Sequence, residues 1–440
     1  MKQIASKPLA ALFALTFTTA VTTACAADLT PMGAEKAGTA DGLVPAWDGG
    51  LNKAPAGFDP KKGYADPFAG EKPSFTITAA NMVQYKDKLT AGQMEMLKRF
   101  PDYKMNVYPS HRTSAYPQSV YDAVKAEAGK ITLAEGGIGV KGLAHSNVPF
   151  PEPKSGVEVI WNHLMRYRGG SIERYSASFP VQTNGTFTPV TFTEHMLLAS
   201  AEANPEPNRL YSFMGLITGP SSVAGQDLLV IEPIDQIEEK RQAWIYNPGQ
   251  RRVMRAPDIS YDSPGQGGDG LRTSDDYDGF NGAPDRYDWK LIGKKEIFIS
   301  YNNYKLTSKG ETYANIVKPG HLNQDMVRYE PHRVWVVEGT LKPGKRHIYA
   351  KRTFYVDEDS WQLAHSDVYD GRGDLWRVHE IESVQYYDVP TTWLAGEVEY
   401  DLQARRYVAT AFTNQEKPLR FNYKLDSGYF TADNLRRLSN

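Results

Sequence analysis

A single cysteine, Cys25, stands in the 440-residue chain, and this scarcity excludes several kinds of chemistry. With no second thiol, the chain forms no internal disulfide, no redox pair and no cysteine-based metal site. Cys25 itself lies in a segment typical of an export signal, so a chain cut after Ala26 has no cysteine nucleophile either. The fold must then be stabilised by burial of apolar surface, for which this length is ample.

Long apolar runs are also missing after residue 26, where no segment reaches the ~18 uninterrupted apolar residues of a membrane-spanning helix. The first 26 residues have a different pattern. Lys2 and Lys7 precede a short apolar stretch at 9–21, and Ala-Cys-Ala at 24–26 supplies the small residues of a cleavage site. We therefore predict that residues 1–26 are a signal peptide and that the mature protein is exported.

The position of Cys25 leaves two destinations open. In the first, cleavage near Ala26 discards the cysteine and releases a protein that is soluble in the periplasm. In the second, Cys25 is acylated and anchors an outer-membrane lipoprotein. A lipobox normally has Leu or Val three residues before its cysteine, where this chain has Thr22, and this misfit favours the periplasmic form.

Positive charge is not in excess. The net charge is −2, and loss of the signal peptide, with two lysines and no acids, shifts it to −4. A mildly acidic chain argues against nucleic acid, and against an anionic membrane surface, as the main partner.

Motifs for catalysis are equally scarce. The chain has no G-x-S-x-G elbow, and His379-Glu380 lacks the second histidine of a zinc protease because Ser383 occupies that position. The glycines at 137–142 match a dinucleotide fingerprint, but the prolines of 147–151 exclude the helix that would hold a pyrophosphate. We expect no catalytic residues, no cofactor and no enzyme activity.

Three regions follow the predicted signal. Residues 27–74 are rich in Gly, Pro, Ala and Asp and are expected to lie extended over the body. Residues 75–170 are expected to form a helical cap region, and residues 171–440 an antiparallel β half-barrel with a long loop at 257–286. A loop of this size inside a compact body usually has a function, such as that of a lid.

Capping residues and apolar spacing locate the helices of the cap region. They are expected at 79–89, at 91–100 after the N-cap Thr90, from Pro117 to about Gly129, and after the capping box of Ser155 and Glu158.

Alternating apolar residues between short polar turns predict the strands. They are expected at 179–182, 186–192, 209–218, 227–233, 289–304, 334–341, 347–356, 361–369, 375–387 and 398–413, with a hairpin at Ala243–Arg255 after the fourth. Parallel strands would require crossover helices between them, and these are missing. We therefore predict an antiparallel meander.

The long loop carries several acidic residues. An EF-hand pattern begun at Asp276 fails, because Phe280 takes a ligand position and Tyr287 replaces the terminal glutamate. We expect these acids to be solvated, in Asx-turns and in pairs with Arg272 and Arg286, and we predict no metal site. An irregular cation site is the alternative.

Two clusters of aromatic and basic residues are the candidates for ligand binding. Trp244 and Tyr246 share one face of a hairpin strand, because side chains two apart point the same way. Trp161, Arg166 and Tyr167 belong to or follow a predicted helix whose aromatic face would close a cavity while its arginines meet a phosphate or carboxylate. The alternative is that both clusters belong to an ordinary packed core.

Segments spread along most of the mature chain resemble domain-of-unknown-function family 1329, a Gram-negative family described as outer-membrane lipoprotein-sorting-like. The matching segments are 29–38, 45–50, 108–112, 161–163, 243–255, 269–273, 280–282, 285–289 and 352–357. The Trp-x-Tyr-x-Pro of the hairpin and residues 354–376 also resemble periplasmic lipoprotein carriers of the LolA/LolB type. The resemblance implies a mainly β fold: a large unclosed antiparallel β-barrel with N-terminal helices covering it.

The resemblance also implies partners, since members of the family are thought to accompany outer-membrane proteins and inner-membrane efflux-type transporters. Exposing each methylene to water costs about 0.8 kcal/mol, so moving a lipid across the periplasm requires a protein cavity. We therefore expect a periplasmic carrier for a lipid, a lipoprotein acyl chain or another hydrophobic small molecule. A non-transporting adaptor that docks an outer-membrane protein or a transporter is the second hypothesis, and a hydrolase is the third.

Overall fold

The computed structural model describes residues 28–439, so the predicted signal peptide and Cys25 lie outside the described residues. The strands are β1 (Phe75–Ile77), β2 (Met105–Val107), β3 (Thr132–Leu133), β4 (Val140–Lys141), β5 (Ser171–Val181), β6 (Val190–Leu198), β7 (Arg209–Gly219), β8 (Leu228–Pro233), β9 (Gln242–Asn247), β10 (Arg252–Arg255), β11 (Tyr287–Ser300), β12 (Tyr329–Leu341), β13 (Lys351–Asp357), β14 (Leu363–Tyr369), β15 (Leu375–Tyr386), β16 (Thr391–Asp401), β17 (Arg406–Phe412) and β18 (Arg420–Phe421). The α-helices are α1 (Ala91–Arg99), α2 (Gln118–Glu127), α3 (Gly156–Met165), α4 (Tyr304–Thr307), α5 (Tyr313–Ile316) and α6 (Ala432–Leu438).

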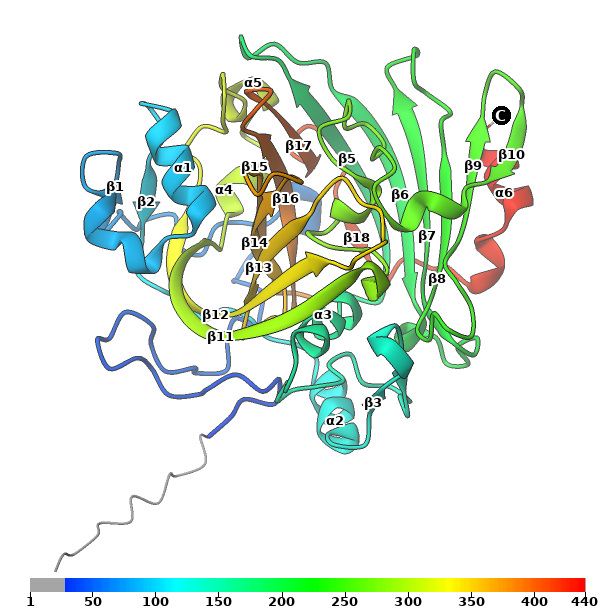
Figure 1. Cartoon of the computed structure of the whole chain (residues 1–440), viewed down its shortest axis with the longest axis horizontal. Coiled ribbons are helices and arrows are strands. Elements are labelled where there is room, and N and C mark those ends of the chain that lie inside the picture. Colours follow the sequence, from blue (N-terminus) through cyan, green and yellow to red (C-terminus); the bar gives the residue numbers. More distant parts are fainter. Residues whose placement is uncertain (1–27, 440) are drawn as a thin grey trace, which may run out of the picture.

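Sixteen of these strands form one twisted sheet (Figure 1). Two antiparallel meanders, β5–β10 and β11–β17, are joined where β17 pairs with β5, with Tyr407 opposite Val181. The one parallel pairing in residues 28–439 is the contact of Val107 in β2 with Tyr329 in β12. The end strands β1 and β10 do not pair with each other within residues 28–439, so the predicted mainly β, antiparallel and unclosed architecture is confirmed.

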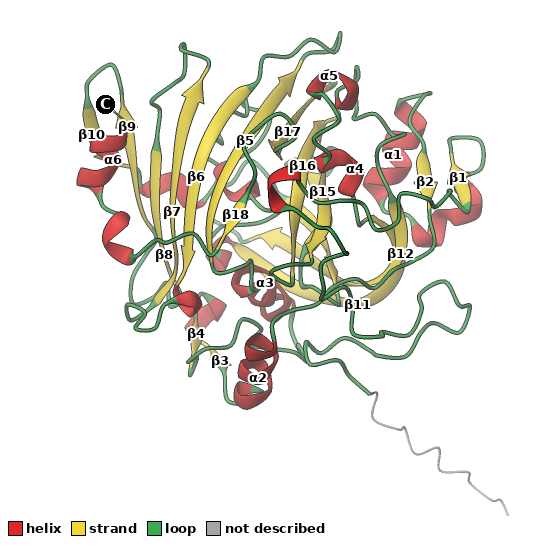
Figure 2. Ribbon diagram, turned by 180° about the vertical axis from the view of Figure 1, so that it is seen from behind, coloured by secondary structure: helices red, strands yellow, loops and turns green. Residues whose placement is uncertain are grey.

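Helices and a long loop cover the two faces of this sheet (Figure 2). On the inner face, α3 packs on β11 and β12, and the loop 257–286 lies beside it. On the outer face, Leu97 of α1 packs in a core with Val378, and Leu435 of α6 packs in another with Leu229. The N-terminal helices therefore cover different faces, and α6, which the sequence did not predict, covers the outer face of β8–β10.

The first predicted helices differ in how closely they match the structure. Helix α1 spans Ala91–Arg99 and begins at the predicted N-cap, where the Thr90 hydroxyl accepts a hydrogen bond from the Gln93 N–H (3.0 Å). The Gln93 side chain in turn accepts from the Thr90 N–H (3.0 Å), which completes a capping box. The segment predicted at 79–89 is a shorter 3₁₀ helix, Met82–Lys88. No helix in residues 28–439 has the length and apolar character needed to cross a bilayer.

Helix α3 begins after Ser155 as predicted, but the predicted capping box is wrong. The Glu158 carboxylate accepts a hydrogen bond from the backbone N–H of Lys154 instead of that of Ser155. The Ser155 hydroxyl is buried without a hydrogen-bond partner among the described residues. The start of α3 therefore depends on the packing of its apolar face more than on its cap.

The prediction of one strand over 398–413 is wrong, because β16 ends at Asp401 and β17 begins at Arg406. The Asp401 side chain accepts hydrogen bonds from the backbone N–H groups of Gln403 (3.1 Å) and Ala404 (2.8 Å). Arg405 takes a left-handed conformation with φ of 55°. The chain therefore reverses here without the glycine or proline that usually marks a turn.

Two carboxyl groups of β15 are buried on the outer face without a cation. Glu380 accepts a hydrogen bond from the Tyr329 hydroxyl (3.1 Å), and Glu382 accepts one from the Ser300 hydroxyl. Among the described residues, no lysine or arginine forms an ion pair with either carboxyl group. Burial raises the pKa of Glu382 to about 7, and burial together with the Glu382 charge raises the pKa of Glu380 well above its ordinary value.

A Glu382→Gln variant is expected to be less sensitive to pH than the wild type. The pKa of Glu382 is higher in the folded state than the ~4.5 expected in the unfolded state, so the protonated carboxyl group stabilises the fold at low pH. This stabilisation is lost as pH rises through about 7, where the folded protein releases the proton. The amide of Glu382→Gln has no such proton, so its stability does not change for this reason. Urea unfolding midpoints at about pH 5 and 8 measure the difference, with exposed Glu238→Gln as the control. An equal pH dependence in both variants would contradict this account.

Candidate ligand-binding cavity

A cavity of about 490 Å³ lies between the inner face of the sheet and the loop 257–286. Strands β5 to β9 and the end of β17 supply one wall, and the loop supplies the other, with Ile259, Tyr277 and Asn281 among its contributions. This volume lies within the roughly 300–1,000 Å³ typical of small-molecule sites. The loop therefore has the position of a lid.

Alternation along the strands gives the cavity an apolar wall. Side chains two apart share a face, so Phe192 and Met196 of β6 both line the cavity, as do Leu228 and Val230 of β8. Ile245 of β9 continues this surface. Leu229, between Leu228 and Val230, points to the outer face and packs there in a core with Leu435 of α6.

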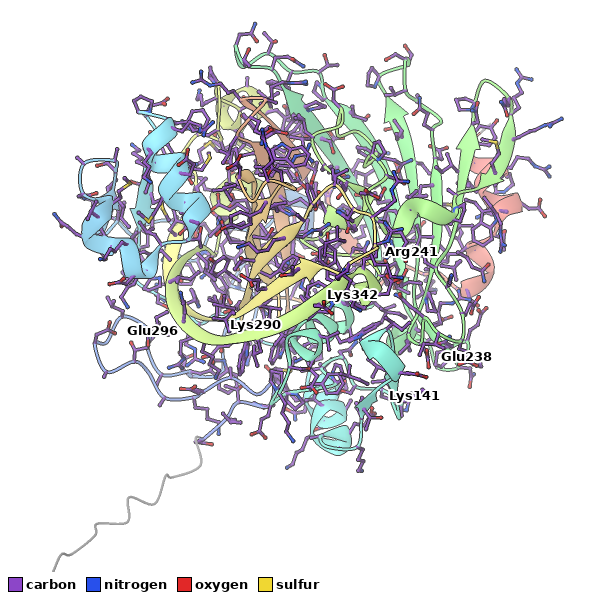
Figure 3. All side chains as sticks on the ribbon, in the orientation of Figure 1. Lys141, Glu238, Arg241, Lys290, Glu296 and Lys342 are labelled. Atoms are coloured by element: carbon purple, nitrogen blue, oxygen red, sulfur yellow. The ribbon has the colours of Figure 1, made fainter. Side chains whose placement is uncertain are left out.

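Four arginines with side chains at most 9% exposed also line the cavity, and each has a carboxylate partner. The pairs are Arg174 with Glu194 (Nε to Oε2, 2.7 Å), Arg168 with Asp278 (Nη1 to Oδ2, 3.0 Å), Arg272 with Glu397 (Nη1 to Oε1, 3.2 Å) and Arg241 with Glu232. Figure 3 shows Arg241 beside the strands of the β5–β10 meander, near the start of the loop. The pairing keeps the wall close to neutral although it is rich in hydrogen-bond donors.

Three of these arginines retain a donor that is not used. Arg168 Nε, Arg174 Nη1 and Arg272 Nε are buried and have no hydrogen-bond partner among the residues that the structure describes. A buried donor without a partner costs about 1–3 kcal/mol, which a ligand oxygen could recover. The cavity therefore combines an apolar surface with several donors suited to an oxygen-rich, acidic group.

Three acids of the loop, Asp275, Asp276 and Asp278, are buried, so the prediction that the loop acids are solvated is wrong for these three. Asp275 and Asp276 are almost completely buried against the inner face. Asp275 accepts a hydrogen bond from Arg352 (2.7 Å), and Asp276 accepts one from the Tyr349 hydroxyl (2.8 Å). Burial raises the pKa of Asp275, but the Arg352 charge and the contacts with His347 and Thr273 together outweigh burial and bring the pKa to about 2. These charged contacts fix the loop to β13 and to the turn before it.

A third loop acid, Asp278, ties the loop to the residues after α3. Its carboxylate is 1% exposed and lies 2.5 Å from Arg166 Nη2 and 3.0 Å from Arg168 Nη1. Burial alone would raise the pKa of Asp278, but the two arginine charges hold it below its ordinary value. The carboxylate therefore stays ionised and holds two buried cations beside the cavity.

Comparison with known proteins identifies the family. A sequence model described as "Protein of unknown function (DUF1329)" matches residues 76–436. The chain belongs to the DUF1329 family. An uncharacterized protein of Pseudomonas aeruginosa, PA3922, is 53% identical over 415 residues, which cover 93% of this chain and 91% of that protein. The family prediction made from the sequence is confirmed.

Solved structures with some likeness to this DUF1329 chain share little sequence with it. A putative outer membrane lipoprotein-sorting protein domain from Vibrio parahaemolyticus is 14% identical, with a TM-score of 0.45, over 64% of this chain and 98% of that one. A DUF1329 family protein from Desulfovibrio piger is 15% identical, with a TM-score of 0.41, over 60% and 90%. The LolA superfamily protein NE2245 from Nitrosomonas europaea is 13% identical, with a TM-score of 0.40, over 64% and 99%.

The five residues predicted to bind a ligand in this DUF1329 chain lie near the cavity but do not line it. Trp161 is fully buried in α3, and its Nε1 donates to the carbonyl of Gly137 (2.8 Å). Arg166 is engaged by Asp278, and Tyr167 packs edge-on to Tyr116. Trp244 and Tyr246 do share a face, but it is the outer one, in the core with α6. Ligand contact through these five residues stays a prediction, while Ile245, between the last two, does line the cavity.

The sequence of this DUF1329 chain predicts which of the cavity residues share a face of a strand, but not that this face lines a cavity. Leu228 and Val230 are two residues apart in a predicted strand, so the sequence alone places both on one face. Alternation does not say which face is covered by a helix and which by a loop. Arg174 and Arg241 stand far apart in the chain, and no motif unites them. Their convergence required the fold.

Proposed function

We propose that this protein is a periplasmic carrier that holds one amphipathic molecule, an apolar chain with an acidic head group, beneath the loop 257–286. The observation that carries the proposal is the hollow between the sheet and the loop, with apolar strand side chains on one wall and unused arginine donors around it. The apolar side chains would bury the chain of the ligand, and the donors would meet its acid group.

The energetics favour a carrier for such a molecule. Each buried methylene contributes about 0.8 kcal/mol, so a chain of ten methylenes contributes roughly 8 kcal/mol before the costs of binding. A guanidinium donor that meets a carboxylate or phosphate adds a charge-assisted hydrogen bond. The pattern of an export signal at residues 1–26 supports a location in the periplasm, an aqueous compartment in which a free lipid would be exposed to water.

The descriptions of two similar proteins agree with this role. One solved structure is described as a putative outer membrane lipoprotein-sorting protein domain and another as a member of the LolA superfamily. We infer that release of the ligand involves a partner in the outer membrane or an efflux-type transporter of the inner membrane. The hollow favours a carrier over a non-transporting adaptor, and none of the described residues that line it is a histidine or cysteine for a hydrolase.

Displacement of a fluorescent fatty acid tests the proposal. The mature protein is expected to bind the probe with about one equivalent, and a long-chain fatty acid should displace it better than the methyl ester of the same chain. Mass spectrometry of an organic extract should detect a co-purified acidic lipid. Equal displacement by acid and ester would contradict the role of the arginines. Absence of both probe binding and co-purified lipid would overturn the carrier itself.

A further inference from the structure

A second group of polar side chains lies on the inner face behind the cavity wall. His379 of β15 stands directly opposite Glu399 of β16, and Glu397 is two residues along the same strand. Side chains two apart share a face, so all three point to the same side of the sheet. All three are at most 2% exposed. The pairing of β15 with β16 thus brings an imidazole and two carboxylates together inside the protein.

The distances between these groups match those between ligands of one metal ion. His379 Nε2 lies 3.3 Å from Glu399 Oε1 and 3.6 Å from Glu397 Oε2, and the three ligand atoms lie within 4.8 Å of one another. In a tetrahedral zinc site with bonds of ~2.1 Å, neighbouring ligand atoms are about 3.4 Å apart. A hydrogen bond between an imidazolium and a carboxylate would be shorter, about 2.7–2.9 Å.

The side chains of this cluster also have atoms that no hydrogen bond uses. Both ring nitrogens of His379 and both carboxylate oxygens of Glu399 are buried without a hydrogen-bond partner in the part of the chain that the structure describes. Leaving a buried carboxylate unsatisfied is costly, and a cation is the partner that would satisfy it best. Within residues 28–439, the one basic group that lies within 4.0 Å of the Glu399 carboxylate is the His379 ring, and no lysine or arginine does so.

Glu397 is held in position by three partners outside the cluster. Its carboxylate accepts hydrogen bonds from Arg272 (3.2 Å), from the Thr410 hydroxyl (3.1 Å) and from the Gly279 N–H (3.2 Å). Such outer partners orient the ligands of metal sites in proteins. Arg272 and Thr410 also line the cavity. An ion in the cavity would therefore be separated from the cluster by only these side chains.

A similar cluster lies on β12, on β13 and in the turn after β13, but an arginine already supplies its positive charge. His332, Asp357 and Asp359 also bring their polar atoms within 4.8 Å of one another. However, Arg112 already donates to both oxygens of Asp359, at 2.8 and 2.6 Å, and so takes the position of a cation. This second cluster provides an internal control for the first.

We propose that His379, Glu397 and Glu399 form a binding site for one divalent metal ion, zinc by its geometry. His379 Nε2 and one oxygen of each glutamate are the protein ligands, and water completes the coordination. The sequence did not reveal this site because its ligands come from two paired strands and follow the register of the sheet, which no linear motif records. The site does not depend on the proposed carrier function.

Metal titration of the folded protein tests the site. Mature protein without a histidine tag is stripped with EDTA and titrated with Zn²⁺ in competition with a chromophoric chelator. One tight equivalent is expected. Glu399→Gln should weaken this affinity by more than the roughly 10–100-fold that loss of an outer-sphere partner causes. His332→Gln should leave it unchanged, since Arg112 already supplies the charge at that cluster.

Cobalt supplies a second measurement that needs no variant. Co²⁺ bound by the wild type should give the visible absorption bands of a four-coordinate nitrogen and oxygen site, and Zn²⁺ should remove them. Circular dichroism shows whether Glu399→Gln folds. No tight equivalent in the wild type, or the same affinity in folded Glu399→Gln, would overturn the proposal and would leave a proton shared among the three side chains.

Discussion

Replacing Asp278 by alanine is expected to lower the free energy of unfolding by about 3–5 kcal/mol, a large part of the stability of a typical protein. The carboxylate contacts Arg166 at 2.5 Å and Arg168 at 3.0 Å, and all three side chains are buried. Without Asp278, two guanidinium groups stay in the interior with no counter-charge. The loss comes mainly from this uncompensated burial, since an intact buried pair adds little on its own.

Urea unfolding of the mature protein measures this effect. Asp433→Asn is the control, because Asp433 is 92% exposed and its ion pair with Arg436 lies at the surface. Surface pairs contribute little, so the midpoint of the control should stay at the wild-type value. A midpoint for Asp278→Ala within experimental error of the wild type would show that water or a rearranged side chain replaces the carboxylate.

Replacing Leu228 by tryptophan is expected to weaken binding of the fatty-acid probe by about 50-fold. Leu228 lines the cavity, and an indole ring there fills space that the ligand would use. Loss of room for three methylenes costs about 2.4 kcal/mol, which corresponds to this factor. Probe titration monitored by fluorescence provides the measurement.

The matched control introduces a tryptophan at a position outside the cavity. Met254 of β10 is 43% exposed and does not line the cavity, so Met254→Trp should bind the probe as the wild type does. Both variants gain one tryptophan, so their fluorescence backgrounds are alike. Equal affinities in the two variants would place the ligand outside the cavity.

Local signals predicted those elements whose formation is itself local. Thr90 and Gln93 cap α1 with atoms only three residues apart, and the alternation of β8 is visible in six residues. The turn at Arg405 was missed because it depends on the Asp401 side chain and on a left-handed residue that is not glycine. Helix α6 was missed because it has only seven residues and is stabilised by packing on β8–β10, which are distant from it in the sequence.

The candidate site was harder to predict than the fold. The sequence placed Trp244 and Tyr246 on one face correctly, but the choice between cavity and core depends on α6, almost two hundred residues later. The apolar wall is lined instead by aliphatic residues such as Leu228 and Val230 together with other aromatic residues, Phe192 and Phe213. The arginines of the wall come from segments between Arg168 and Arg272 that only the folded sheet brings together.

The seam between β17 and β5 determines when the cavity can form during folding. Each meander forms by pairing neighbours in the chain, but Tyr407 must find Val181 across more than two hundred residues. Contacts of such long range form slowly, because the entropy of closing the intervening chain opposes them. Arg174 of β5 and Thr410 of β17 stand on opposite sides of this seam and both line the cavity. The cavity is therefore complete only when the two meanders have met, which makes it one of the last parts of the protein to form.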